Sequence, residues 1–252
     1  MITLKTKEEI EIMQEGGRKT SAVLKKVLQA ARPGSSLLEL EEMAQVQIRR
    51  LGGEPAFKRV PGYNSATCLN VNEGIVHGLP SGRKLKEGDI LSVDLGVYYK
   101  GFNTDSSWTI YVGDESHASG DKLKFLKTGE QALVQAMGEA KAGNRVRDIS
   151  AAMQEVLEGN GYTPVDSLVG HGIGRELHEE PQIPCLVIKD PGPILKEGMT
   201  LAVEVIYTQG GRELKVEEDG WTVSSTDGSL SGLFEHTIVV ANEGPIILTK
   251  QE

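Results

Sequence analysis

The sequence has few cysteines and no long apolar run, and each absence argues against a class of protein. Its two cysteines, Cys68 and Cys185, form no C-x-x-C pair, which argues against a disulfide framework or a zinc ribbon and favours a reducing compartment. No stretch is long or apolar enough to span a bilayer, and the opening MITLKTKEEIEIM has no signal-peptide core. We therefore expect a cytoplasmic protein with no membrane partner.

Basic charge is also scarce. The 27 Lys and Arg residues against 36 Asp and Glu give a net charge of −9, which argues against a nucleic-acid partner because such binding needs a basic face. Hydrophobic residues make up 38% and charged residues 25% of the chain, as in ordinary globular proteins. No linker is visible, and the sequence has no heptad repeat. We expect residues 1–252 to form a single domain and a monomer.

The local patterns predict two pairs of helices, each followed by strands. Capping boxes, in which a Ser or Thr precedes a Glu by three residues, open the first two helical patterns at Thr6 and Ser36. These helices should end near Pro33-Gly34 and Gly52-Gly53, and Gly16-Gly17 should loosen the first. The second pair is expected at 123–142 and 149–157. The β-rich runs are ATCLNVN, DILSVDLGVYY and SSWTIYV, then PCLVI, TLAVEVIY, WTVSS and HTIVVA.

The chain repeats itself across its two halves. LKEGDILSVDLGV at 85–97 resembles LKEGMTLAVEVIY at 195–207, and each copy places one acid, Asp94 or Glu204, inside an apolar run. The helices correspond at nearly the same offset, so that Gly34 matches Gly143. We infer pseudo-repeats of about 1–113 and 114–252 in an α+β fold. Strands of both halves should form one antiparallel sheet with helices covering one side, and Asp94 and Glu204 should meet face to face.

Carboxylates buried in an apolar sheet must share protons or bind a cation. Two more acids join the pair: Asp105 follows Asp94 across a hairpin signal, and Glu235 is placed at the head of a strand in LFEHTIVV, which echoes TDSSWTIYV. A histidine, His171, lies within reach in GHGIGRELHEEP. Four carboxylates and one histidine suit two divalent ions, with Mn, Fe(II), Co or a catalytic Zn all open. Such a site should lower the pKa of a bridging water and supply hydroxide to attack an acyl bond.

Four motifs make the resemblance to a family specific. NEGIVHG, DLG with an acid eleven residues after its Asp, GHGIGRELHEEP and LFEHT occur in this order. They resemble the type I methionine aminopeptidases, which are metallopeptidases of the pita-bread fold, and the likeness covers essentially the whole chain. It implies removal of the N-terminal methionine from nascent polypeptides, with possible transient ribosome contact. Two positions depart from the family: Val205 stands where Pro is frequent, and Leu177 where many members have Phe.

The resemblance also implies a ligand role for five side chains. Asp94 would chelate one metal ion, and Asp105 and Glu235 would bridge both. His171 and Glu204 would complete the second ion, and Glu204 would also shuttle a proton.

Five further residues would contact the substrate. His178 would stabilise the charge that builds on the scissile carbonyl oxygen, and His77 would contact the scissile amide nitrogen. Tyr63, Cys68 and Trp221 would line the methionine pocket, which suits an unbranched thioether side chain.

Two alternatives stay open. An Xaa-Pro peptidase of the same superfamily would share the ligands but usually carries an additional N-terminal domain. A catalytically inactive, peptide-binding relative would typically have lost ligands, whereas all five are present in this sequence. The acids Glu73, Glu179 and Glu180 are expected to be structural or solvated.

Overall fold

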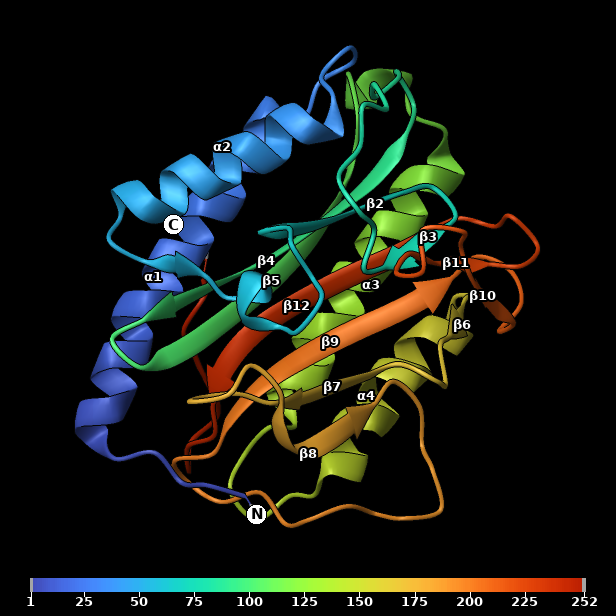
Figure 1. The fold of residues 1–252 in the computed structure, drawn as a ribbon. Helices are drawn as coiled ribbons and strands as arrows, with labels where there is room; N and C mark the ends of the chain where they lie inside the picture. The colour runs from blue at the N-terminus through green and yellow to red at the C-terminus, as the bar shows by residue number, and fades with distance from the viewer. Residues whose placement is uncertain (1, 251–252) are drawn as a thin grey trace.

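The computed structural model describes residues 2–250. Its elements follow one another in two groups, and each group has a pair of α-helices followed by strands (Figure 1). The α-helices are α1 (Lys7–Ala30), α2 (Leu37–Arg50), α3 (Gly120–Gly138) and α4 (Val146–Gly159), and single 3₁₀ turns lie at Phe57–Arg59 and Glu115–His117. The strands are β1 (Glu54–Pro55), β2 (Thr67–Val71), β3 (Gly74–Val76), β4 (Ile90–Tyr99), β5 (Phe102–Tyr111), β6 (Thr163–Pro164), β7 (Val169–Gly172), β8 (Glu179–Pro184), β9 (Thr200–Thr208), β10 (Leu214–Val216), β11 (Val223–Ser225), β12 (Ser231–Val239) and β13 (Ile246–Ile247). Within residues 2–250, no helix is both long and apolar enough to cross a bilayer.

Side-chain caps fix where the helices begin. Both predicted capping boxes are confirmed: the Thr6 N–H donates to the Glu9 carboxylate at 2.9 Å, and the Ser36 box has the same reciprocal bonds. Helix α3 begins three residues before the predicted start, because the Ser119 hydroxyl caps it ahead of the first apolar residue. It also ends earlier, at Gly138, because the following residues pair with Ala241 instead of continuing the helix.

Ten strands form one antiparallel sheet, and the two halves of the chain meet at its centre. The main order is β1-β4-β5-β12-β9-β7-β8, with β2 beside β4, β6 beside β9 and β13 beside β12. Strands β5 and β12 form the seam between the halves. A small second sheet joins β10, β11 and β3.

One predicted strand is wrong. Only the first residue of the run PCLVI, Pro184, pairs in the sheet, opposite Val169, because β8 ends there and is otherwise built from the residues that precede the run. The apolar run instead packs toward α4, where the Val187 N–H donates to the Gln154 side chain at 2.8 Å. A short apolar run therefore indicated burial correctly but not strand pairing.

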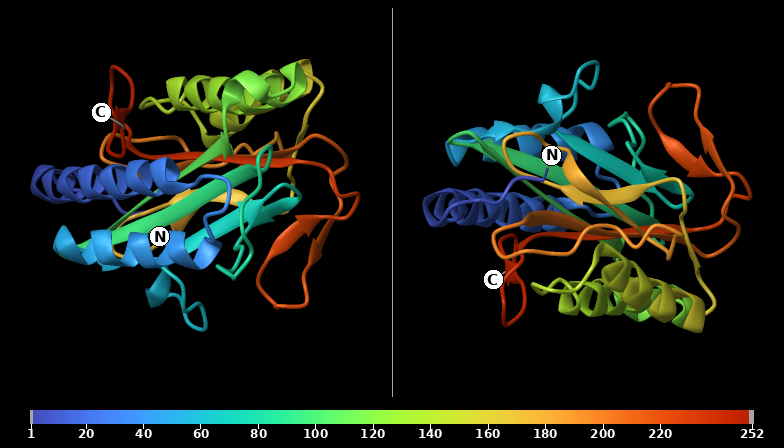
Figure 2. Two further views of the ribbon diagram at one scale, coloured as in Figure 1. Left: turned by 90° about the horizontal axis from the view of Figure 1, so that it is seen from above. Right: turned by 90° about the horizontal axis from the view of Figure 1, so that it is seen from below.

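Alternation along the strands separates a helix-covered face from a polar one. The odd residues of β4, from Leu91 to Val97, are buried with apolar side chains of α1 and α2. The odd residues of β9, from Leu201 to Tyr207, pack in the cluster that contains α3 and α4. Figure 2 shows these helix pairs as two separate layers against the sheet. Asp94 and Glu204 have the opposite parity, so their side chains point to the other face.

The repeated sequences make the same backbone bonds in both halves. The Gly34 N–H donates to the Leu85 carbonyl at 2.8 Å, and the Gly143 N–H donates to the Leu195 carbonyl at 3.0 Å. The predicted α+β class with two pseudo-symmetric halves in one sheet is confirmed. The assignment of the whole chain to one domain stays a prediction.

The paired glycines of α1 do not loosen the helix as predicted, because α1 is continuous from Lys7 to Ala30. Their role is close packing. A Cβ atom on Gly17 would lie 2.2 Å from the Leu248 carbonyl oxygen, whereas one on Gly16 would have its nearest neighbour, the Thr104 hydroxyl, at 3.4 Å. Gly17 therefore lets the C-terminal segment lie directly on α1.

This difference predicts opposite effects for two neighbouring substitutions. Gly17→Ala should lower the free energy of unfolding by about 1–3 kcal/mol, the usual cost of overpacking. Gly16→Ala should leave it unchanged or raise it by up to about 1 kcal/mol, because alanine favours a helix over glycine. Urea denaturation of both variants checks this, and equal effects would contradict the packing explanation.

Candidate metal centre and substrate cavity

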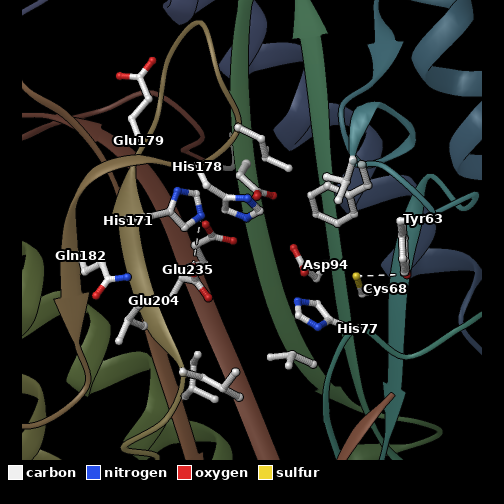
Figure 3. Close-up of a pocket in the computed structure, with 18 of the residues that line it drawn as sticks. Tyr63, Cys68, His77, Asp94, His171, His178, Glu179, Gln182, Glu204 and Glu235 are labelled. Carbon is white, nitrogen blue, oxygen red and sulfur yellow. Dashed lines mark hydrogen bonds and ion pairs between the residues drawn. The ribbon is translucent and has the colours of Figure 1, made fainter. Parts of the chain in front are cut away.

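A cavity of about 490 Å³ lies on the polar face of the sheet (Figure 3). The structure brings all ten predicted site residues to its wall: Tyr63, Cys68, His77, Asp94, Asp105, His171, His178, Glu204, Trp221 and Glu235. These residues come from both halves of the chain.

Four neighbouring strands each supply one carboxylate. Glu204 on β9 lies directly opposite Glu235 on β12, whereas Asp105 on β5 pairs with Gly96, two residues along β4 from Asp94. Two expectations need correction. Glu235 lies in the middle of its strand, because β12 already begins at Ser231. Asp94 and Glu204 do not meet directly, because the central pair β5–β12 lies between their strands.

Asp105 and Glu235 are buried and Asp94 and Glu204 are half-buried, and the group lacks enough hydrogen-bond partners. Among the described residues, neither Oδ1 of Asp94 nor Oε1 of Glu235 has a hydrogen-bond partner. Burial raises the pKa of Asp94, Glu204 and Glu235 far above the ordinary range, and the charge of Asp105 raises each of them further. Burial also raises the pKa of Asp105 to about 7. An oxygen-rich cluster of this kind fits divalent cations, which would satisfy the orphaned oxygens and relieve the repulsion.

His171 presents a lone pair to these acids. Its Nδ1 lies 2.8 Å from the Gly172 carbonyl oxygen, which can only accept, so Nδ1 carries the proton and Nε2 is free to coordinate. Nε2 lies 3.4 Å from Oε1 of Glu204. Burial, and next His178, lower the pKa of His171 to about 4, so the ring is neutral at pH 7. One donor atom each from Asp105, His171 and Glu235 lie within 4.8 Å of one another.

Two further neutral histidines face the cavity. The ring centroid of His178 lies 4.5 Å from that of His171, and burial lowers the pKa of His178. His77 directly follows β3 with φ of 57°, a left-handed backbone conformation that is unusual outside glycine. Burial and then His178 lower the pKa of His77. A neutral imidazole can donate one hydrogen bond and accept another, so both rings can serve a peptide group.

An apolar wall closes the other end of the cavity. Tyr63 and Trp221 meet edge to face with centroids 5.0 Å apart, and the Tyr63 hydroxyl donates to the Thr67 carbonyl at 2.8 Å and contacts Sγ of Cys68 at 3.2 Å. Burial, followed by the nearby Asp94, raises the pKa of the Cys68 thiol, so the side chain acts as an apolar wall. Leu177, the departure from the family's Phe, also lines this cavity.

Sequence reasoning missed one acid, Glu41, that holds the cavity in shape. The Glu41 carboxylate accepts the N–H groups of Ala66 and Thr67 and the Thr67 hydroxyl, just before Cys68. The sequence did contain an indication of this role, because Glu41 lies four residues after Leu37 and so falls on the buried face of α2, where a carboxylate needs partners. Glu179, expected to be structural or solvated, lines the cavity and forms an ion pair with Lys5.

Comparison with known proteins agrees with the geometry. A model for metallopeptidase family M24 matches residues 11–242. Methionine aminopeptidase 1 of Bacillus subtilis is 41% identical over 250 residues, covering 99% of this chain and all of the relative. The crystal structure of a methionine aminopeptidase from Thermotoga maritima has a TM-score of 0.95 at 40% identity, covering 99% of this chain and 100% of that one. A prolidase from Pyrococcus furiosus has a TM-score of 0.80 at 25% identity, and the match covers 99% of this chain but 66% of the prolidase. These likenesses confirm the pita-bread fold.

The raised pKa of Asp105 predicts a pH-dependent effect of Asp105→Asn in metal-free protein. Because the folded-state pKa is about 7 against an ordinary 3.8, the folded protein keeps a proton that the unfolded chain releases between pH 4 and 7. Its contribution to stability is therefore lost as pH rises through this window. Asparagine does not titrate, so its stability should not fall in this window. The free energy of unfolding of the variant should therefore rise by about 2–4 kcal/mol relative to that of the parent between pH 4 and 7.

Urea denaturation in EDTA at several pH values measures this difference. A difference that stays constant from pH 4 to 7 would show that Asp105 is already ionised in the folded protein. Addition of Mn²⁺ should stabilise the parent more than the variant.

Proposed function

Because the chain belongs to metallopeptidase family M24, we propose that it removes the N-terminal methionine from newly made polypeptides. The observation that carries this proposal is the convergence of four carboxylates, two of them buried and two half-buried, and three histidines on one cavity beside an apolar pocket. The full-length likeness to methionine aminopeptidases supports the same activity.

Five side chains would hold two divalent ions: Asp94, Asp105, His171, Glu204 and Glu235. Bound ions of this kind lower the pKa of water, so that hydroxide is available near neutral pH. Mn, Fe(II), Co and Zn all suit the donor set, because carboxylates and a neutral imidazole bind each of them. The unpartnered oxygens of Asp94 and Glu235 support this assignment.

The chain's own groups would then orient and protonate the peptide. His178 donates a hydrogen bond to the scissile carbonyl oxygen as negative charge builds there. His77 contacts the scissile amide nitrogen. The Glu204 carboxylate would take the proton of the attacking water and pass it to the departing amine.

Substrate choice would follow from the two ends of the cavity. The carboxylates attract the free α-amine of the first residue, while Tyr63, Cys68 and Trp221 surround its side chain. A flexible thioether fits such an irregular apolar pocket. The TM-score of 0.95 at 40% identity to a methionine aminopeptidase, against 0.80 at 25% to the prolidase, favours the aminopeptidase over an Xaa-Pro peptidase.

The setting of the reaction is also part of the proposal. Action on nascent chains implies a cytoplasmic enzyme that contacts ribosomes transiently, and we expect it to work as a monomer. The two buried free cysteines support a reducing, cytoplasmic location.

The activity is tested by comparing two tripeptides. Protein stripped with a chelator and supplied with Mn²⁺, Fe²⁺ or Co²⁺ should release methionine from Met-Ala-Ser and leave Leu-Ala-Ser intact, because a branched side chain fits the pocket poorly. Release of free amino acids is the measurement. Equal turnover of both peptides would defeat the methionine assignment, and cleavage of Ala-Pro alone would favour the prolidase alternative. Protein that neither retains metal nor cleaves either peptide would support the inactive relative.

Alanine substitutions distinguish the metal ligand His171 from the hydrogen-bond donor His178. His171→Ala should abolish turnover and lose bound metal. His178→Ala should keep its metal content but lower kcat by about 10²–10³-fold, the usual cost of one oxyanion donor. The exposed His117, whose replacement by alanine should change neither quantity, provides the control. Loss of metal from His178→Ala would contradict its assigned role.

A further inference from the structure

A six-residue turn, residues 173–178, separates the two adjacent histidine rings. His171 lies inside β7, whereas His178 lies outside the strands, immediately before β8. The β7–β8 ladder changes register between His171 and Gly172, so regular pairing is interrupted beside this turn. The backbone ladder therefore fixes His171 more directly than it fixes His178.

Neighbouring strands hold the first part of the turn. The Thr200 hydroxyl donates to the Ile173 carbonyl, and the Asn103 N–H donates to the Gly174 carbonyl at 2.7 Å. Arg175 pairs with Glu9 at 2.7 Å, but its side chain is 68% exposed. These contacts lie three or more residues before His178, so other groups must hold the last part of the turn in place.

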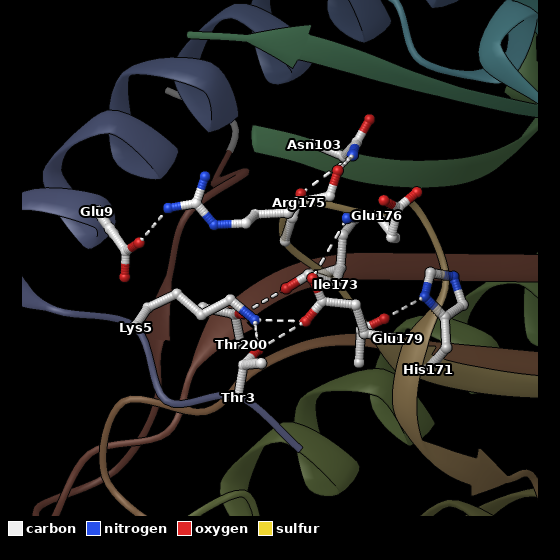
Figure 4. A network of polar contacts seen from close by, with 12 residues as sticks. Thr3, Lys5, Glu9, Asn103, His171, Ile173, Arg175, Glu176, Glu179 and Thr200 are labelled. Carbon is white, nitrogen blue, oxygen red and sulfur yellow. Dashed lines mark hydrogen bonds and ion pairs between the residues drawn. The ribbon is translucent and has the colours of Figure 1, made fainter. Parts of the chain in front are cut away.

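A buried ion pair holds the residue that follows His178 (Figure 4). The Lys5 Nζ donates to Oε2 of Glu179 at 2.5 Å, and the two side chains are 4% and 14% exposed. The Thr3 hydroxyl donates to the same oxygen at 2.9 Å. The other oxygen, Oε1, faces the Glu176 N–H at 3.3 Å. One carboxylate thus joins the N-terminal segment to the backbone of the turn.

The N-terminal segment is itself anchored. The Lys5 N–H donates to the Gly198 carbonyl at 2.8 Å, just before β9. Gly174 leaves room for the Lys5 side chain, since a Cβ atom there would lie 2.4 Å from Lys5 Cε. The lysine ammonium therefore sits at a fixed point relative to the strand that carries Glu204.

The geometry points to Lys5 as a positioning residue that acts through Glu179 to set the place of the His178 ring in the cavity. This inference rests on the proposed function, in which His178 donates to the scissile carbonyl oxygen. Without the lysine, the half-buried Glu179 carboxylate would lose its counter-ion and keep only the Thr3 hydroxyl and the Glu176 N–H, so it would turn toward water and move the adjacent His178. A misplacement of about 1 Å can lower a rate by about 10²-fold.

The first test compares Lys5→Met with Lys19→Met. Methionine keeps most of the side-chain volume and removes the charge, and Lys19 pairs with Glu15 on α1, away from the cavity. With Met-Ala-Ser, Lys5→Met should lower kcat by about 10–100-fold, with KM and metal content close to the parent's. Lys19→Met should match the parent. A parent-like kcat for Lys5→Met, or loss of its metal, would overturn the inference.

A double-variant cycle separates positioning from general weakening. Lys5→Met added to His178→Ala should lower kcat by no more than about 2-fold, because the group through which Lys5 acts is already gone. An effect as large in that background as in the parent would show that Lys5 does not act through His178. If Lys5→Met fails to fold, Glu179→Gln, which removes the ion pair with an isosteric amide, takes its place in the same cycle.

A spectroscopic readout separates this inference from the proposed function. In metal-free protein, the imidazole NMR signals of His178 should shift in Lys5→Met, while those of the exposed His117 do not. The comparison needs no turnover, so it holds even if the protein fails to cleave Met-Ala-Ser. Unchanged His178 signals in Lys5→Met would contradict the positioning role.

Discussion

Four carboxylates from β4, β5, β9 and β12 share the wall of one cavity, and their burial and mutual repulsion constrain everything around them. Such a cluster is costly to fold, so stability must come from elsewhere. It comes from the opposite face of the same strands, where alternate residues pack against both helix pairs. The apolar face of the sheet thus stabilises the fold, and the polar face carries the site. Bound cations would offset the repulsion between the carboxylates, because each carboxylate would then face a positive charge.

The duplicated halves supply two acids each, but the site depends on how the halves differ. Strand β2 lies beside β4 and brings Cys68 opposite Asp94, whereas β7 lies beside β9 and brings His171. Figure 3 shows Tyr63 and Cys68 on the side of Asp94, and His171 and His178 on the side of Glu204 and Glu235. The equivalent strand therefore provides a pocket wall in the first half and a nitrogen donor in the second, which places a side-chain pocket next to a metal centre.

Local patterns predicted much of this, and long-range contacts account for the rest. The capping boxes at Thr6 and Ser36 depend on residues three apart, and the acids were found through the echo between the halves. PCLVI was mistaken for a strand because burial against α4 leaves the same apolar signature as a sheet. The ion pair between Lys5 and Glu179 spans 174 residues, and the contact of Leu248 with Gly17 is still more remote in sequence, so neither leaves a local pattern.

The most direct test of the central claim is an anomalous difference map from a crystal soaked in Mn²⁺. The account predicts two peaks about 3.5–4 Å apart. They should lie within coordination distance of Asp94, Asp105, His171, Glu204 and Glu235. A map without peaks in the cavity, with these five side chains directed away from a common centre, would contradict it.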